Sequence, residues 1–405
     1  MRISTNMIYD MGSSKIADLQ AAMLKTQQQI STNRRVLTPA DDPIASASAI
    51  GINQAISMNE QFTTNRQNAK GALAQEESVL QSMTMLLQSV KDAVVGAGNA
   101  SMNDEQRRMY LAQLNTNYDE LLGLANTRNA NGEYIFSGYS TSTQPFSKTD
   151  GGATYAGDQG QRMLQVSTDR QMSTSDSGNK VFESTLTGNG HFTTSAAATN
   201  AGGGVISLGS VVDRTQLNGS TYTLTFAIDP VTEETTYTVT EVPAPPVPAT
   251  PQPFVSGEPI VINGMQISIE GKPADGDEFT IEPSKAQSIF ATVANLIAAF
   301  DEPMSGEVGQ ARLTNALNAA NNHLDRTLDT VSSIRGSIGS RLNEIENLDN
   351  VGSDLAIQYA DTLKTLVEID PVEAYSQFTQ QQYTLEAAQQ SFIKITGLSL
   401  FNLLR

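Results

Sequence analysis

The chain has 405 residues, a formal net charge of −18, no cysteine and two histidines far apart in sequence. The missing thiols exclude a disulfide framework and a thiolate metal site, and two distant histidines are too few for a zinc cage or a histidine-based triad. The acidic charge repels phosphates and so disfavours nucleic-acid binding, and no apolar run of about 18 residues predicts a helical membrane span.

The first 40 residues predict a thinly apolar helix. Four apolar residues follow heptad spacing, with Thr26 between them: Ile16, Leu19, Met23 and Ile30. Such a helix is marginal alone. It is therefore either a frayed terminus or a helix that folds when partners cover it. The segment lacks the apolar core of a cleaved secretory signal. Asp42 followed by Pro43 is typical of an N-cap with proline at the first helical position, so a second helix is predicted from there.

Two further helices are predicted, over residues 43–97 and 104–130, with a loop between them. Their apolar residues keep the alternating three- and four-residue spacing, as at Leu73, Leu80 and Leu87, with Glu76 at one seam position. Stripes of this kind form packing cores far more often than cofactor sites. We therefore expect a helical bundle here.

The pattern changes to short strands after Asn129. The first are predicted at residues 133–138, 153–157, 163–167 and 181–182. From 183 to 282 the pattern is all β. It has one hairpin over 222–240 and another around Asn263-Gly264, joined by a proline-rich linker at 242–248. The acidic residues 275–278 fit a tight turn better than a calcium loop.

Helical spacing returns at Ser284, in a seam that runs from Ala286 to Phe300. A much longer heptad seam then covers 313–369, and Asp370-Pro371 repeats the N-cap signal. The last helix carries Phe378, Leu385 and Phe392, which are spaced seven residues apart. Its apolar end, at 398–404, either docks on the chain's own core or is kept for a partner.

The predicted fold is mainly α with a β insertion: an elongated, antiparallel helical bundle built from both termini, plus a β-rich outer domain. Hydrophobic residues at 39% and aromatic residues at 6% suit such thin packing. The expected parts are a terminal helix 1–40 paired with 370–405, a bundle 41–183 paired with 283–369, and an insertion 184–282.

Several short motifs, spaced in order along the chain, resemble those of one family. They are Met1–Thr5, Ile30–Ile44, Tyr134–Gly138, Gln144–Phe146, Tyr155–Asp158, Gly178–Phe182 and Leu385–Leu404. Together they resemble the flagellin-like hook-associated proteins of the flagellar hook–filament junction, the FlgL family. The signature residues are Asp41, Asp42, Pro43, Phe136 and Gly138. Flagellin is the alternative, but alanine usually follows its Asp-Asp pair, where this chain has Pro43.

The resemblance implies a structural adaptor subunit of the bacterial flagellum, without catalysis or cofactor. It implies self-association in a ring, contact with a neighbouring hook-associated junction protein and with flagellin, and no nucleic-acid or membrane partner. It also implies type III export to the extracellular flagellum, with an export chaperone at the C-terminal helix. The predicted assembly contacts are Ile16, Leu19, Met23, Ile30, Phe378, Leu385, Phe392 and Leu400.

Two other classes of protein fit the sequence less well. An enzyme would need a glycine-rich loop before a helix, a histidine cluster or a cysteine nucleophile, and none of these is present. A coiled-coil receptor would need a membrane-spanning segment.

Overall fold

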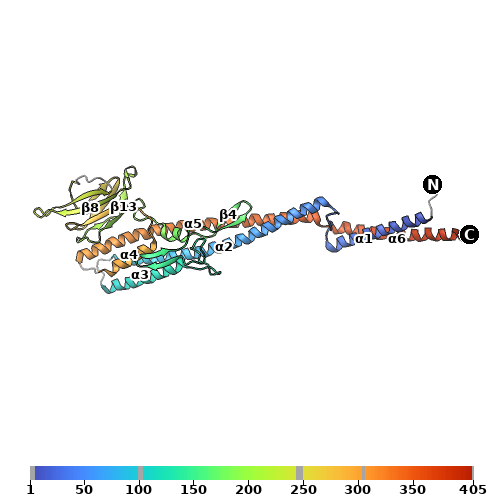
Figure 1. Cartoon of the computed structure of the whole chain (residues 1–405), viewed down its shortest axis with the longest axis horizontal. Helices are drawn as coiled ribbons and strands as arrows, with labels where there is room; N and C mark the ends of the chain where they lie inside the picture. Colours follow the sequence, from blue (N-terminus) through green and yellow to red (C-terminus); the bar gives the residue numbers. More distant parts are fainter. Residues whose placement is uncertain (1–4, 99–103, 243–249, 303–305, 404–405) are drawn as a thin grey trace. The chain divides into compact units, whose positions relative to one another are not determined.

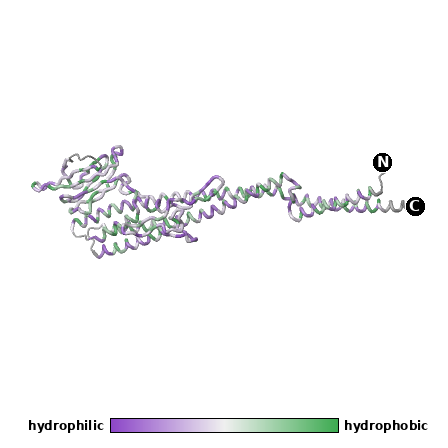
Figure 2. Tube along the Cα trace, viewed as in Figure 1, coloured by the Kyte–Doolittle hydropathy of each residue, from purple (hydrophilic) through white to green (hydrophobic). Residues whose placement is uncertain are grey.

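A computed structural model describes residues 5–98, 104–242, 250–302 and 306–403, with side chains described for 7–98, 105–242, 250–302 and 306–396. The chain divides into two compact units. Unit 1 comprises residues 1–64 and 347–405, and unit 2 comprises residues 65–346. Hydrophobic and hydrophilic positions alternate along the helices of each unit (Figure 2). The five-part division expected from the sequence stays a prediction.

Unit 1 is helical and is built from both ends of the chain. Helix α1 (Thr5–Thr32) and helix α6 (Pro371–Leu403) lie side by side and antiparallel, with both termini at the same end of the pair (Figure 1). The first part of α2 (Pro43–Ala97) and the last part of α5 (Gly306–Val367) complete the unit. The predicted pairing of the two terminal helices is confirmed.

Both predicted Asp-Pro helix starts are confirmed. The Asp42 carboxylate accepts a hydrogen bond from the backbone N–H of Ala45 at 3.0 Å. The Asp370 carboxylate does the same for the N–H of Val372 at 2.8 Å. Each carboxylate thus satisfies a backbone donor that has no partner within its helix.

The helical part of unit 2 contains the rest of α2 and α5, together with α3 (Asp104–Ala125) and α4 (Ile289–Asp301). The predicted seams form its core: Leu73, Leu80, Leu87, Leu324, Val331 and Ile338 are all buried. Helix α4 starts at Ile289 rather than near Ser284, because Ala286 forms a β-bridge with Leu186 and Ser288 caps the helix. Helix α3 ends at Ala125, earlier than predicted.

Two short hairpins lie within unit 2: β1 (Phe146–Thr149) with β2 (Gly152–Tyr155), and β3 (Met163–Ser167) with β4 (Arg170–Ser173). The predicted strand at 133–138 is wrong, since only Tyr134 forms a single bridge, with Arg128. The predicted strand at 181–182 is also wrong, because Asn179–Glu183 is a π-helical turn. Both segments are short apolar runs, which is typical of strands, and their apolar side chains are indeed buried. Their backbone groups, however, form the hydrogen bonds of turns and not those of a sheet.

The β-rich part of unit 2 has two larger sheets. The strands are β5 (Phe192–Ala196), β6 (Val205–Ile206), β7 (Ser210–Val211), β8 (Thr221–Ile228), β9 (Thr235–Val242), β10 (Gln252–Pro253), β11 (Pro259–Ile262), β12 (Met265–Glu270) and β13 (Glu278–Pro283). One sheet has the order β10-β9-β8-β13-β5, and the other contains β11-β12-β6 with β7 beside β12. Side chains of both sheets form one core, which includes Phe192, Phe226 and Ile267.

Both predicted hairpins of this region are confirmed. Asn263 and Gly264 both have positive φ angles, of 41° and 76°, as a two-residue hairpin turn of the mirror-image type requires. Strands β8 and β9 form the other hairpin. Acidic residue Asp277 is buried in a turn, where it accepts backbone N–H groups from Ala201 and Ala274. Most of the proline-rich linker, residues 243–248, lies outside the described residues.

Candidate assembly interface

The predicted assembly residues meet in the seam between α1 and α6. Leu385 is buried, and the other described members are partly buried: Ile16, Leu19, Met23, Ile30, Phe378 and Phe392. The Phe392 ring lies 5.2 Å from the Tyr9 ring, and Gly12 lets it approach α1. The structure therefore joins the two stripes within one chain. The Leu400 side chain lies outside the described residues. The role of these residues between copies stays a prediction.

A second set of apolar side chains on this helix pair lies off the seam and is exposed. On α1 it comprises Met7, Ile8, Met11 and Leu24; on α6 it comprises Val372, Tyr375, Tyr383 and Ile393. We call this set the outward apolar face. Its members are all exposed, from 42% for Ile8 to 80% for Val372. Heptad spacing did not reveal it, because its members lie off the seam; Tyr375 and Tyr383 were the available signal.

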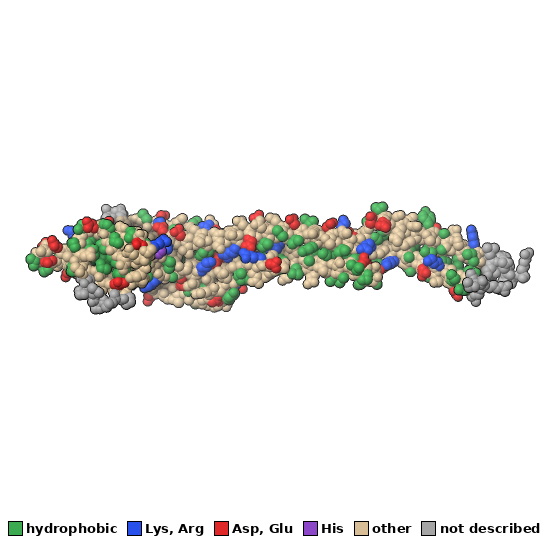
Figure 3. Space-filling view, turned by 90° about the horizontal axis from the view of Figure 1, so that it is seen from above, with side chains coloured by type: hydrophobic (Ala, Val, Ile, Leu, Met, Phe, Trp, Pro, Cys, Tyr) green, Lys and Arg blue, Asp and Glu red, His purple; other side chains and the backbone are tan. Residues whose placement is uncertain are grey.

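So many exposed large apolar side chains on one thin helix pair are unusual for a protein that works alone. Figure 3 shows hydrophobic side chains at the surface along the molecule, with acidic and basic groups between them. Burying one large apolar side chain contributes roughly 1.5–3 kcal/mol. Several such side chains on each copy would therefore provide a substantial free energy of association.

The seam itself contains two polar interruptions. Thr26 is buried, and its hydroxyl donates to the carbonyl of Ala22 in its own helix, at 3.1 Å. The side-chain oxygen of Gln381 is buried without a hydrogen-bond partner among the described residues. A buried polar group without a partner costs roughly 1–3 kcal/mol. The α1–α6 pair is thus weaker than an all-apolar seam would make it.

The signature residues Asp41 and Asp42 hold the connection between α1 and α2. The Asp41 carboxylate accepts from Lys25 Nζ at 2.6 Å and from the backbone N–H of Thr38 at 2.9 Å. These bonds, the Lys25 bond first, lower the pKa of Asp41 to about 2. The hydrogen bond from the Ala45 N–H, followed by that from Arg35, lowers the pKa of Asp42.

The same connection is tied to the end of α5. The Arg35 backbone N–H donates to the carbonyl of Val367 at 2.7 Å, and its guanidinium donates to the carbonyl of Leu366 at 2.7 Å. Arg34 forms a β-bridge with Glu368. The breaks between α1 and α2 and between α5 and α6 are therefore joined to one another. Pro43 opens α2 at this point.

The signature residues Phe136 and Gly138 belong to unit 2 and are structural. The Phe136 ring packs edge-on against Phe182, with 5.2 Å between the centroids, in an aromatic cluster that also holds Phe146 and Phe290. Gly138 has a φ angle of +73°, and any Cβ there would lie 2.5 Å from the carbonyl oxygen of Asp158. Only glycine fits this turn.

A buried charge cluster joins four segments of unit 2. The Asp176 carboxylate accepts from Arg341 Nη2 at 2.6 Å and from Lys180 Nζ at 2.7 Å, while its backbone N–H donates to Glu76 at 3.1 Å. Burial, reinforced by the Asp176 charge, raises the pKa of Glu76 to about 8. Burial acts against the charge of Asp176, but the bonds from Lys180 and Arg341 outweigh it and lower its pKa.

Two findings bear on other classes of function. Within the part of the chain that the structure describes, no three His, Cys, Asp or Glu side chains cluster as metal ligands would. No described helix is long and apolar enough to cross a membrane.

Comparisons with known proteins give a consistent family. Residues 3–141 match the bacterial flagellin N-terminal helical region. Flagellar hook-associated protein 3 of Escherichia coli strain K12 is 29% identical over 404 residues, which cover 100% of this chain and 99% of that protein. The crystal structure of the flagellar junction protein FlgL from Legionella pneumophila is 31% identical, with a TM-score of 0.71, and the match covers 79% of this chain and 100% of that one.

The flagellin alternative is matched over a much shorter stretch. Flagellin of Listeria monocytogenes is 25% identical over 131 residues, which are 32% of this chain and 46% of that protein. The match to the hook-associated protein, by contrast, spans both helical ends and the β-rich part between them. The chain belongs to the FlgL family of flagellar hook-associated protein 3.

Proposed function

We propose that the chain is a structural junction subunit of the bacterial flagellum, joining a hook-associated layer to the flagellin filament. The single observation that carries this proposal is the outward apolar face on a helix pair made from both ends of the chain. A subunit that works alone gains nothing from such a face, whereas a subunit in a ring can bury it against its neighbours. The names of its relatives point to the same role.

The assembly step follows from the strengths of the two surfaces. The seam between α1 and α6 is interrupted by Thr26 and Gln381, so the pair is weakly held in the free subunit. Contact with neighbours would bury the outward apolar face and add intermolecular burial to the intramolecular seam. The ordering of the two terminal helices is then completed on assembly.

The expected neighbours are further copies of the chain in a ring, a hook-associated junction protein on one side and flagellin on the other. Before assembly the subunit passes through the type III export route, with a chaperone covering the apolar surface of α6. The chain holds no cysteine, so no disulfide locks it before passage. Its final location is the hook–filament junction of the extracellular flagellum.

Two double variants test the proposal. Leu385→Ser with Phe392→Ser removes seam contacts and is expected to abolish assembly while the β-rich part stays folded. Tyr375→Ser with Tyr383→Ser alters only exposed side chains of the outward apolar face, so α1 and α6 should still pair while assembly fails. The readouts are motility, filament attachment and circular dichroism of the purified subunit. Motile flagella in both variants would contradict the proposal.

A further inference from the structure

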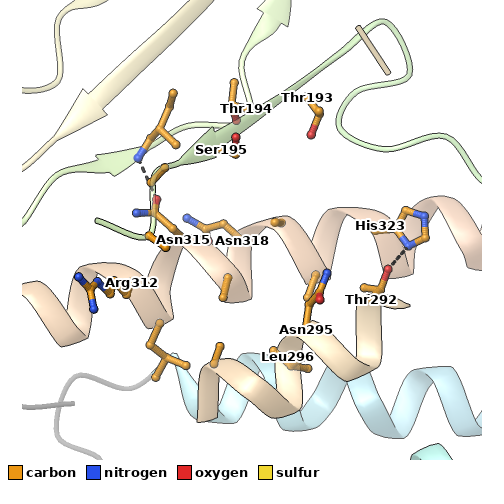
Figure 4. A pocket seen from close by; sticks show the side chains of 18 of the residues that line it. Thr193, Thr194, Ser195, Thr292, Asn295, Leu296, Arg312, Asn315, Asn318 and His323 are labelled. Atoms are coloured by element: carbon orange, nitrogen blue, oxygen red, sulfur yellow. Dashed lines mark hydrogen bonds between the residues drawn. The ribbon is translucent and has the colours of Figure 1, made fainter. Parts of the chain in front are cut away.

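A groove lies within unit 2 between the edge strand β5 and the helices α4 and α5. It encloses about 490 Å³, a size typical of small-molecule pockets. Figure 4 shows β5 above the groove and α5 below it, with Asn315 and Asn318 on the side of α5 nearest to β5. Nothing in the assembly proposal uses this groove.

Four polar side chains line the groove without a hydrogen-bond partner among the described residues. Thr193 and Ser195 come from β5, Asn295 from α4 and Asn318 from α5. Two hydroxyls and two carboxamides together offer donors and acceptors to one ligand. Asn315 is not among them, because its amide oxygen accepts from the backbone N–H of Ile206 and its amide nitrogen donates to the carbonyl of Gly204.

The floor of the groove is made of small apolar side chains: Ala299, Ala316 and Ala319, beside Leu296 and Leu208. The charged groups at one end are Arg312 and Glu302, which lie 4.0 Å apart. Arg312 also donates to the carbonyl of Asn200 at 3.0 Å. At the other end, burial lowers the pKa of His323, and a hydrogen bond of 2.8 Å joins its Nδ1 to the hydroxyl of Thr292. The interior therefore favours a neutral ligand.

The unpaired polar groups of the lining indicate the kind of ligand. The Thr194 hydroxyl is not among them, because it donates to the carbonyl of Ser207, next to β6. The unpaired groups are side-chain amides and hydroxyls, which suit a ligand with several hydroxyl groups. None of the described residues that line the groove is Phe, Tyr or Trp, so stacking contributes nothing to binding.

We propose that this groove binds a neutral carbohydrate of one or two sugar units, held by the amides of Asn295 and Asn318 and the hydroxyls of Thr193 and Ser195. The Ala299, Ala316 and Ala319 methyl groups contact the apolar face of the sugar ring. Because only hydrogen bonds and a small apolar floor contribute, the dissociation constant is on the order of 1 mM.

The test uses the full chain with labelled alanine methyl groups, titrated with maltose and with N-acetylglucosamine and observed by NMR. The expected result is a saturable shift of the Ala299, Ala316 and Ala319 methyl signals with at least one of the two sugars. Glucuronate, which carries a charge, is expected to bind more weakly. No shift of these three signals with either sugar at about 50 mM would overturn the proposal.

A double variant locates the site. Asn295→Ala with Asn318→Ala removes both carboxamides from exposed helix positions, where alanine favours the helix, so the fold is kept. Binding should weaken about 10-fold or more, the loss expected for two neutral hydrogen bonds. The matched control is Asn343→Ala, an exposed asparagine of α5 outside the groove, which should leave binding unchanged. Undiminished binding in the double variant would contradict the assignment.

Discussion

Arg341 donates a 2.6 Å hydrogen bond to the carboxylate of Asp176, whose side chain is fully buried. Arg341 comes from α5, and Asp176 from the loop that follows β4. The same guanidinium also reaches the carbonyl of Ser173 at 3.2 Å. The pair thus ties a loop to the longest helix of unit 2, in surroundings where an unpaired charge is costly.

Breaking this pair should strongly destabilise unit 2. Arg341→Met leaves the buried Asp176 charge with Lys180 as its remaining cation, and the expected loss is roughly 3–5 kcal/mol of unfolding free energy. The matched control is Arg170→Met, because the Arg170–Glu344 pair is largely exposed and such pairs contribute about 1 kcal/mol or less. Urea unfolding of both variants gives the comparison. Equal losses would show that Asp176 does not depend on Arg341.

Glu76 should make the stability of unit 2 depend on pH. Its folded pKa of about 8 lies above its ordinary value of 4.5, so folding favours the protonated form. The stabilisation is fully present below pH 4.5 and is lost as the pH rises towards 8. The charged groups that face Glu76 are Asp176, Lys180 and Arg341.

Glu76→Gln removes this titration. The variant and the parent should have similar unfolding free energies near pH 4.5. Above that pH the variant should be the more stable of the two, by at most about 1.4 kcal/mol for each unit by which the folded pKa of Glu76 exceeds its ordinary pKa. Thermal unfolding from pH 4.5 to 9 measures it, with exposed Glu120→Gln as a flat control. A constant difference between variant and parent across this range would rule out a buried, protonated Glu76.

Gln381→Leu should strengthen the α1–α6 pair. The change removes a buried side-chain oxygen that has no partner among the described residues, and it makes the seam continuous. The expected gain is about 1 kcal/mol or more, seen as slower amide exchange in both helices. Gln382→Leu, at the exposed position next to it, is the control and should change exchange little. A loss of protection in Gln381→Leu would mean that the amide has a structural role.

Gly138→Ala should lower the free energy of unfolding far more than Gly132→Ala does. Both glycines have positive φ angles, of 73° and 82°, so alanine at either position is strained by roughly 1–2 kcal/mol. A Cβ at Gly132 meets open space, whereas one at Gly138 meets the backbone of Asp158. Chemical denaturation should therefore show an additional loss for Gly138→Ala. Equal effects would mean that the turn moves freely away from Asp158.

Local signals were enough to predict most of the fold. Heptad spacing predicted the helices, Asp42-Pro43 and Asp370-Pro371 predicted two helix starts, and Asn263-Gly264 predicted a hairpin. Short apolar runs without a clear period were misleading, because they were predicted to be strands. Tyr134–Gly138 and Val181-Phe182 are short apolar runs whose side chains enter the core, and a short run cannot distinguish a strand from a turn.

The candidate sites depended on contacts that spacing does not reveal. Spacing predicts that the two terminal stripes pair, but it does not predict that another set of apolar residues, including Tyr375 and Tyr383, stays exposed. Spacing shows Glu76 as a charge in an apolar seam. It does not show Asp176, which donates to Glu76 from about 100 positions further along the chain, or Arg341, which donates to Asp176 from about 265 positions beyond Glu76. The groove beside β5 likewise combines residues from three distant elements.

The most direct test of the assembly account is hydrogen exchange on the free subunit and on the subunit within assembled flagella. The account predicts fast exchange for α1 and α6 in the free subunit, slow exchange for the core of unit 2, and strong protection of both terminal helices after assembly. Terminal helices already as protected as unit 2 in the free subunit, or unchanged after assembly, would contradict it. The outward apolar face would then have no role in joining subunits.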